Sequence, residues 1–160
     1  MTIRTAVPAD LREIAALEAA CFPAAEAASE AVLAARLAAW PNHFWLLEAD
    51  GRIAAMVNGL VTDEAVLRDE MYGDAGMHSE TGAWQMIFGV DTLPEYRRRG
   101  FAAELLRRAI ADAGAQGRRG VVLTCKDELV HYYEKFGFRN EGVSRSVHGG
   151  AVWYDMRLTF

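Results

Sequence analysis

The residues best suited to chemistry form a short basic segment, Arg97-Arg98-Arg99-Gly100-Phe101-Ala102. The first backbone N–H groups of a helix have no partner within the helix, and the helix dipole is positive there. Gly100 and Ala102 keep side-chain bulk away, so an anion can approach these N–H groups closely. The three arginines add forked donors that suit phosphate. The segment therefore predicts a diphosphate-binding site.

The elements on either side of this segment are those that a phosphate site requires. An apolar run at residues 86–90 predicts a buried strand, and apolar residues at helical spacing from Ala102 to Ala113 predict an amphipathic helix. An arginine run before a helix is more often only a solvated face. The strand–turn–glycine–helix context favours the ligand site, as does the contrast with the net charge of −5.

Two motifs resemble a known family. Arg97-x-x-Gly100-x-Ala102, after a strand and Pro94-Glu95-Tyr96, resembles the acetyl-coenzyme A motif of the GNAT-superfamily N-acetyltransferases. Residues 123–130, followed by Tyr132-Tyr133-Glu134-Lys135-Phe136-Gly137-Phe138, resemble the arylalkylamine (serotonin-type) branch of that superfamily. The superfamily resemblance covers nearly the whole chain, whereas the branch resemblance covers roughly residues 84–142.

The resemblance implies an α/β fold with a mixed, mostly antiparallel sheet of about seven strands, a splayed central strand pair and helices on both faces. It also implies acetyl-CoA as the cosubstrate. The pantetheine arm would pair with the central strand, where Gly89 suits a bulge or a close backbone approach. The expected coenzyme-binding residues are Val90, Asp91, Thr92, Arg97, Arg98, Arg99, Gly100, Phe101, Ala102 and Ala103.

Tyr133 matches the catalytic tyrosine of the family, which implies that it protonates the coenzyme A thiolate. Periodicity alone favours a different interpretation, because Leu129, Tyr133 and Phe136 share one helical stripe that is typical of a core. A buried tyrosine still needs a hydrogen-bond partner for its hydroxyl, so both interpretations can hold together.

The general base is not assigned. An alkylammonium has a pKa of about 10.4, so the neutral nucleophile is a roughly thousandfold minority at neutral pH. The histidine positions of the arylalkylamine branch hold Met86 and Phe88, and neither side chain can move a proton. Asp91 is ionisable but can equally be structural, His78 lies in a loop, and His131 points about 100° away from Tyr133. A water chain is the alternative.

The acceptor site is expected near residues 21–30 and 63–82, where acidic residues would attract a cationic amine. An ordinary solvated acidic surface explains each of these residues equally well. The polar loop 73–82 is a candidate lid or substrate rim, with a simple surface loop as the alternative. The expected substrate-binding residues are Phe22, Glu26, Glu30 and Trp84.

Length and composition limit the class of protein. The 160 residues predict a single domain, 1–160, and no apolar run approaches the ~20 residues of a membrane span. The acidic balance speaks against a nucleic-acid partner. Two cysteines are too few for a disulfide framework or a metal site, so we predict no metal. We also predict a cytoplasmic location and a monomer or homodimer.

Local signals predict the remaining elements. We expect helices at 11–21, 29–40, 63–72 and 127–136, with Asp10 and Ser29 as N-caps of the first two. Strands are expected at 2–7, 44–49, 53–61, 121–125, 138–147 and 151–159. Asp50-Gly51 predicts a tight hairpin turn between the second and third of these.

The leading hypothesis is an acetyl-CoA-dependent N-acetyltransferase acting on a small primary amine, such as an (aryl)alkylamine or a polyamine. The alternatives are a protein or peptide N-acetyltransferase, and a non-catalytic acyl-CoA sensor, which the missing strand histidines motivate. A dinucleotide enzyme ranks lower, because residues 97–102 are not G-x-G-x-x-G.

Overall fold

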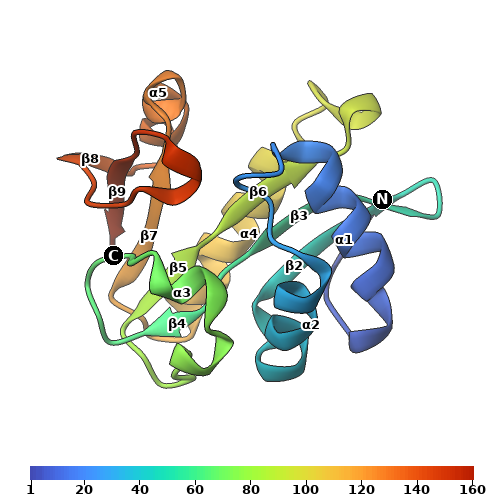
Figure 1. Ribbon diagram of the computed structural model, residues 1–160, viewed down its shortest axis with the longest axis horizontal. Helices are drawn as coiled ribbons and strands as arrows, with labels where there is room; N and C mark the ends of the chain where they lie inside the picture. The colour runs from blue at the N-terminus through green and yellow to red at the C-terminus, as the bar shows by residue number, and fades with distance from the viewer.

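The computed structural model describes residues 1–160 and contains nine strands in two sheets (Figure 1). The sheets have the orders β1-β2-β3-β6 and β4-β5-β7-β9-β8, and only the β5–β7 pair is parallel. This confirms the expected mixed, mostly antiparallel α/β fold. The strands are β1 (Thr2–Thr5), β2 (Phe44–Ala49), β3 (Arg52–Asn58), β4 (Val61–Thr62), β5 (Trp84–Ile87), β6 (Gly89–Thr92), β7 (Gly120–Cys125), β8 (Arg139–Val143) and β9 (Tyr154–Thr159).

The two sheets separate at Phe88. The expected strand at 85–92 is divided there, so that β5 pairs with β7 in one sheet while β6 pairs with β3 in the other. The expected strand at 53–61 is divided in the same way at Gly59, where an added Cβ would lie 1.8 Å from the carbonyl oxygen of Met86. These two divisions account for nine strands where about seven were expected, and the first one produces the expected splay.

Helices cover both faces of the sheets. In Figure 1, α1 (Leu11–Cys21) and α2 (Glu30–Ala39) lie in front of the strands, and α4 (Phe101–Ala115) lies behind them. Two short helices, α3 (Glu70–Gly73) and α5 (Val130–Glu134), lie near the two ends of the second sheet. Successive residues of a strand face opposite sides, so β2 gives Trp45 and Leu47 to the α4 core and Phe44 and Leu46 to the α1–α2 core.

Two of the local signals are confirmed. Ser29 caps α2, because its Oγ accepts a hydrogen bond from Val32 N–H at 3.2 Å. Asp50 and Gly51 form the predicted hairpin turn, and both have positive φ values, 54° and 73°. Asp10 does not cap α1 with its side chain, since its carboxylate instead accepts from Val7 N–H at 2.8 Å and pairs with Arg4.

Four expected elements are shorter than predicted. In 63–72 only the end is helical, as part of α3; near the start, Thr62 Oγ1 accepts from Glu64 N–H, and Asp63 accepts from Ala83 N–H at 3.1 Å. The helix expected at 127–136 is a 3-10 turn followed by α5. The last two strands stop short of each other, because Asp69 binds residues 146 and 147 and draws the connecting segment across the molecule.

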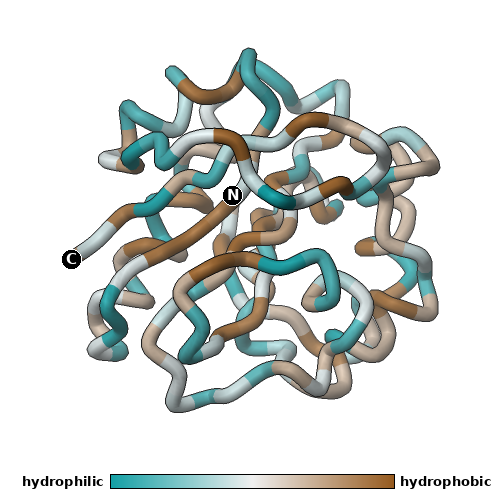
Figure 2. Tube along the Cα trace, turned by 60° about the vertical axis from the view of Figure 1, so that its left-hand side comes forward, coloured by the Kyte–Doolittle hydropathy of each residue, from teal (hydrophilic) through white to brown (hydrophobic).

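The chain has no helix that combines the length and the apolar character needed to cross a membrane. In Figure 2, hydrophobic and hydrophilic colours alternate at short intervals along the trace. This alternation is expected where most elements bury one face and expose the other.

Candidate functional site

The separation of the sheets at Phe88 opens a cavity of about 570 Å³, here called the central cavity. It lies between β6 and the last residues of β7, whose Thr124 and Cys125 pair only with β9. β6 is likewise the edge of its sheet and is paired only with β3. Two strand edges therefore face a shared space that can take an extended molecule.

The start of α4 borders a second cavity of about 360 Å³, here called the helix-end cavity. Gly100 is the N-cap of α4 with φ 79°, a left-handed conformation that favours glycine, and open space surrounds its missing Cβ. Arg98 also has a positive φ, 65°. The cavity brings together most of the predicted coenzyme-binding residues, namely Val90, Thr92, Arg97, Arg98, Gly100, Phe101, Ala102 and Ala103.

Two predicted coenzyme residues lie outside the helix-end cavity. Arg99 packs over the ring of Tyr96 at 5.1 Å instead of lining it. Asp91 is fully buried on the other face of β6, because adjacent strand residues point to opposite sides. Neither side chain therefore contacts the space where the diphosphate is expected.

The two cavities adjoin, since Cys21, Phe22 and Val90 line both of them. Cys21 lies at this junction and donates its thiol hydrogen to the carbonyl oxygen of Thr92 at 3.2 Å. One groove thus runs from the first turn of α4, along β6, into the middle of the molecule. Its charged end and narrow interior fit the diphosphate and the pantetheine arm of a coenzyme A.

Tyr133 lies at the interior end of this groove. It is 7 % exposed and lines the central cavity, and its ring packs edge-on against Tyr132 and Phe138. Burial raises the pKa of its phenol, so the hydroxyl stays protonated at neutral pH. Tyr133 is thus a core residue that also presents a proton donor to the cavity, which agrees with both interpretations of the sequence.

Three polar residues line the central cavity, a fourth is buried beside them, and we call the four the Glu18 cluster; Asp91 is the buried one. They are Glu18, Arg36, Asn58 and Asp91, contributed by α1, α2, β3 and β6. Arg36 donates to Asn58 Oδ1 at 3.1 Å and to the carbonyl oxygen of Tyr72 at 2.8 Å. Burial lowers the pKa of Arg36 to about 10, which leaves it charged at neutral pH.

The outer end of the central cavity is covered where two loops meet. Glu26 forms an ion pair with Lys126 at 3.0 Å, and its carbonyl oxygen lies 2.9 Å from His148 Nε2. Gly149 presses against this loop, since an added Cβ would lie 2.5 Å from Glu26 Cγ. Trp153 and His148 line the space beneath. We call residues 22–29 and 144–153 the roof.

The predicted substrate-binding residues divide into two pairs. Phe22 and Glu26 line the central cavity as expected. Glu30 is exposed at the first turn of α2 and lines neither cavity. Trp84 is a buried core residue lying between the guanidinium groups of Arg119 and Arg157, at 5.3 and 4.6 Å from its ring centre. Tertiary packing thus removes Glu30 and Trp84 from the acceptor space.

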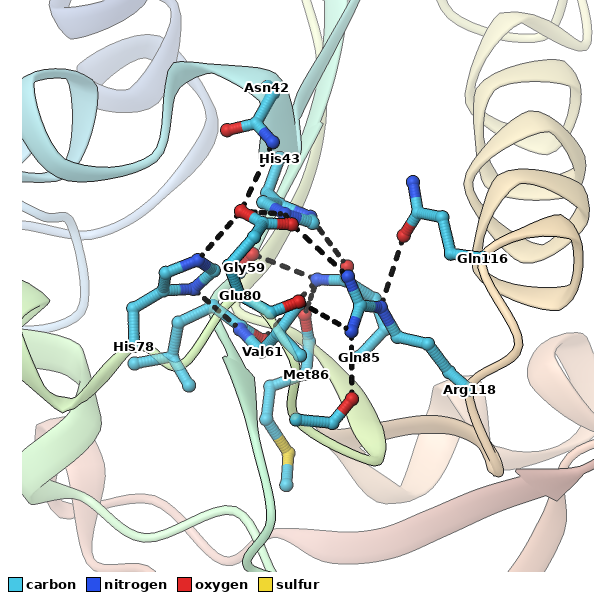
Figure 3. A network of polar contacts seen from close by, with 12 residues as sticks. Asn42, His43, Gly59, Val61, His78, Glu80, Gln85, Met86, Gln116 and Arg118 are labelled. Carbon is cyan, nitrogen blue, oxygen red and sulfur yellow. Dashed lines mark hydrogen bonds and ion pairs between the residues drawn. The ribbon is translucent and has the colours of Figure 1, made fainter.

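The loop at 73–82 is mostly fixed by a second polar network, the Glu80 cluster (Figure 3). The Glu80 carboxylate accepts from His43 Nε2 at 2.9 Å, His78 Nε2 at 3.1 Å and Arg118 Nη2 at 3.2 Å. Burial opposes its ionisation, but hydrogen bonds from His43, His78 and Asn42 lower the pKa of Glu80 to about 2. From 73–82 only Gly73 reaches the central cavity, so a lid function for the whole loop has no contact to support it.

The proton positions in the Glu80 cluster follow from its partners. Val61 N–H donates to His78 Nδ1 at 3.0 Å, so the ring hydrogen of His78 is on Nε2. Gln85 Nε2 donates to backbone carbonyls, so its Oε1 accepts from His43 Nδ1–H at 2.9 Å. His43, His78 and Glu80 have metal-like spacing, but His78 has no free lone pair for a metal or for an amine proton.

Sequence reasoning missed several cavity residues. Arg36, Asn58, His148 and Trp153 line the central cavity but belong to segments with no recognisable motif, and Lys126 lies in the 123–130 motif without having been singled out. Glu18 carried a weak signal, because a charged residue near the apolar face of α1 is unusual. His131, considered as a base, is exposed to solvent at 96 % of its side chain.

Comparison with known proteins agrees with this geometry. The acetyltransferase (GNAT) family profile matches residues 11–138. The serotonin N-acetyltransferase of Mesocricetus auratus is 28 % identical over 111 residues, which are 69 % of this chain and 52 % of that protein. The chain thus spans about half the length of this curated relative, and the similarity leaves the serotonin-type branch as a proposal.

Two solved structures share the fold over nearly the whole chain. The GNAT-like decarboxylase GphF in complex with isobutyryl-CoA has a TM-score of 0.84 and 25 % identity, and the match covers 99 % of both chains. A GNAT family acetyltransferase from Brucella melitensis in complex with acetyl-CoA has a TM-score of 0.64 and 20 % identity, covering 99 % of this chain and 87 % of that one. The predicted membership of the GNAT superfamily is therefore confirmed. The chain belongs to the acetyltransferase (GNAT) family.

Proposed function

We propose that residues 1–160 act as one domain that transfers the acetyl group of acetyl-CoA to a small primary amine, such as an (aryl)alkylamine or a polyamine. The observation that carries the proposal is the continuous groove from the α4 N-terminus to Tyr133. Arg97, Arg98 and the N–H groups after Gly100 would hold the diphosphate, and the free edge of β6 would pair with the pantetheine amides.

Acetyl-CoA supplies the acyl group and a thiolate leaving group. Tyr133 is the proposed acid that gives its hydroxyl proton to the departing sulfur, because it is a protonated hydroxyl on the cavity wall. The burial that raises the phenol pKa would also raise the pKa of a thiol beside it, so the proton can still pass from oxygen to sulfur.

The roof favours a small acceptor over a protein chain end. The contact of Glu26 with His148 joins the two loops of the roof, and the ion pair of Glu26 with Lys126 ties the first loop to the end of β7. A peptide would need an open groove at this point, whereas a small amine can be enclosed beside Phe22, Tyr72 and Trp153. A peptide acceptor therefore requires these contacts to break.

A thiol-release assay over arylalkylamines, polyamines, amino acids and peptides tests the function. We expect Tyr133→Phe to lower kcat by about 100-fold or more, the usual range for a lost acid catalyst. Calorimetry should show coenzyme affinity unchanged within about twofold. Tyr154→Phe is the control, since Tyr154 lines neither cavity. Equal changes in kcat and affinity, or no change in either, contradict the acid function.

A second candidate is decarboxylation of a 2-carboxyacyl-CoA. The observations that favour it are the similarity to GphF and two cations on the cavity wall, Arg36 and Lys126, of which Arg36 has an unpartnered buried Nε. In this reaction the bond to the carboxylate carbon breaks, the thioester takes the electron pair, and the α-carbon is then protonated. Carbon dioxide release from malonyl-CoA without any amine would favour it. Coenzyme binding with neither activity would favour the sensor.

A further inference from the structure

The Glu18 cluster is buried, yet several of its polar atoms have no hydrogen-bond partner. Glu18, Arg36, Asn58 and Asp91 are 6 %, 3 %, 0 % and 0 % exposed. Buried polar atoms in folded proteins nearly always have hydrogen-bond partners, and a group that lacks one calls for an explanation. Here Glu18 Oε1, Asn58 Nδ2 and both oxygens of Asp91 have no donor–acceptor partner.

These free atoms converge on one residue of the cavity wall. A Cβ added to Gly89 would lie 2.9 Å from Asp91 Oδ1, 3.6 Å from Asn58 Nδ2 and 3.7 Å from Glu18 Oε1. Gly89, Glu18 and Asn58 all line the central cavity. The missing side chain of Gly89 therefore lets a small polar group of a bound molecule approach the cluster.

Glu18 and Asp91 interact with each other, and two neighbouring carboxyl groups in a buried site resist being ionised together. Burial and the adjacent Glu18 raise the pKa of Asp91 well above its usual range. The raised pKa favours the protonated, neutral form of Asp91. Glu18 Oε2 also accepts from Ala28 N–H at 2.9 Å, which fixes the carboxylate and leaves Oε1 free.

We propose, on the basis of the function proposed above, that Glu18 is the catalytic base that takes a proton from the ammonium group of the acceptor. Asp91 and Asn58 are positioning residues that hold the Glu18 carboxylate. The central strand needs no histidine in this arrangement, so Met86 and Phe88 can occupy the places of the family's histidines.

The proton balance closes with Tyr133. The ammonium gives one proton to Glu18 Oε1, and the neutral amine then forms the new C–N bond. When the C–S bond breaks, the sulfur takes the hydroxyl proton of Tyr133, and the phenolate recovers a proton from the nitrogen. One proton remains on Glu18 and is released to solvent as the products leave.

The surroundings of Glu18 contain one cation and several neutral groups. Arg36 supplies the positive charge, and it is held 4.7 Å above the ring of Phe88. Asp91 is neutral, and burial raises the pKa of Cys21 and brings that of Tyr72 to about 12, so both stay protonated at neutral pH. The titratable or charged groups that face the pair are Cys21, Arg36, Tyr72 and, through Cys21, Arg97.

The test is Glu18→Gln, with kcat/KM measured from pH 6 to 10 against the best amine of the panel. We expect a loss of about 100-fold or more at pH 7. In the variant, kcat/KM should rise about tenfold per pH unit up to the pKa of the amine, because only free amine from solution can react. Coenzyme affinity should change less than about twofold, and Glu18→Asp should recover part of the activity.

Glu13→Gln is a matched control on the same helix. Glu13 Oε2 accepts from Ile53 N–H at 3.0 Å, as Glu18 Oε2 does from Ala28, but Glu13 lines neither cavity. We expect the control to keep wild-type turnover and its pH profile. If Glu18→Gln does the same, the proposal is overturned while the proposed function stands.

A second readout separates the two proposals. Carboxyl carbon NMR of the wild type should show Asp91 still protonated at pH 7, and this titration should shift to lower pH in Glu18→Gln. Independent titration of both carboxyls in the ordinary acidic range overturns the shared-proton pair, even if amines are acetylated. A wild type that acetylates no amine but shows the coupled titration refutes the proposed function and, with it, Glu18 as an amine base.

Discussion

The Glu80 cluster and the Glu18 cluster have similar compositions but differ in how far they are satisfied. Each contains a buried arginine, a buried amide side chain and at least one carboxyl group. Around Glu80 every carboxylate oxygen has donors, and Gln85 and Arg118 bind backbone carbonyls. Around Glu18 several buried polar atoms have no partner in the protein.

The difference indicates which of the two clusters is there for the fold. A fully satisfied network rigidifies its surroundings, and here it fixes the loop at 73–82 to β5 (Figure 3). A network with unpartnered atoms costs stability, and such a cost is retained where a ligand completes the network. The comparison predicts that the Glu80 cluster affects stability and the Glu18 cluster affects turnover.

The largest expected effect is that of Gly89→Ala. The new methyl group would meet Asp91 Oδ1 at 2.9 Å and occupy the space that the unpartnered atoms surround. We expect kcat/KM to fall about 100-fold, or about 2.7 kcal/mol, because a displacement near 1 Å has this cost at a catalytic site. Gly114→Ala in α4 is the control, since its Cβ meets only the Phe160 ring at 3.7 Å. Equal turnover in both variants would remove the cluster from the site.

The next effect concerns stability. His43→Leu removes the hydrogen bonds to Glu80 and Gln85 and leaves Gln85 Oε1 buried without a donor. We expect the free energy of unfolding to fall by about 2–4 kcal/mol, measured by urea denaturation. The kcat/KM of the folded variant should stay within about twofold of the wild type. A large loss of turnover with unchanged stability would reverse the assignment of the two clusters.

A smaller effect is the pH dependence of stability, which differs between the two clusters. The pKa of Asp91 is raised in the folded state, so its contribution to stability is complete below about pH 3.8 and declines as the pH rises toward the raised value. Asp91→Asn removes this titration. Between pH 5 and 8 the stability of the wild type relative to the variant should fall with pH, by at most about 1.4 kcal/mol per unit. If the difference in stability between the wild type and Asp91→Asn stays constant over this pH range, proton sharing with Glu18 is contradicted.

The smallest expected effect concerns Glu80, whose contribution makes stability change with pH in the opposite direction to that of Asp91. Hydrogen bonds lower its folded pKa to about 2 from an ordinary value of 4.5, despite burial. Its stabilising contribution is therefore present above pH 4.5 and is lost as the pH falls toward 2. The urea midpoint of Glu80→Gln should depend less on pH than that of the wild type between pH 5 and 2.5. The change is modest, because the Glu80 side chain is 55 % exposed.

The parts of the site that sequence could predict are those whose signals are contiguous. The Gly100 turn, the start of α4 and Tyr133 each lie within a motif of a few residues, and the structure places the first two at the helix-end cavity and Tyr133 at the central cavity. Gly89 also signalled a close approach in the central strand. The separation of the two central strands could therefore be predicted from the sequence, although the break itself falls one residue earlier, at Phe88.

The Glu18 cluster could not be found in this way. Its members come from four elements spread over residues 18–91, and only Glu18 carries even a weak signal within its own element. Asp91 was placed on the coenzyme side, but strand alternation puts it opposite Val90, among residues from α1 and α2. Trp84 was expected at the substrate, but its ring fills a core position between two arginines that only the fold brings together.

The break at Phe88 also bears on aggregation through strand edges. A strand edge with unpaired backbone groups is a template on which other chains can polymerise. β6 has such an edge, but the end of α1 and the first turn of α4 flank it, so a neighbouring chain cannot lie alongside. A slender flexible molecule can still enter lengthwise, so the same geometry that admits a ligand protects the protein from aggregation through this strand.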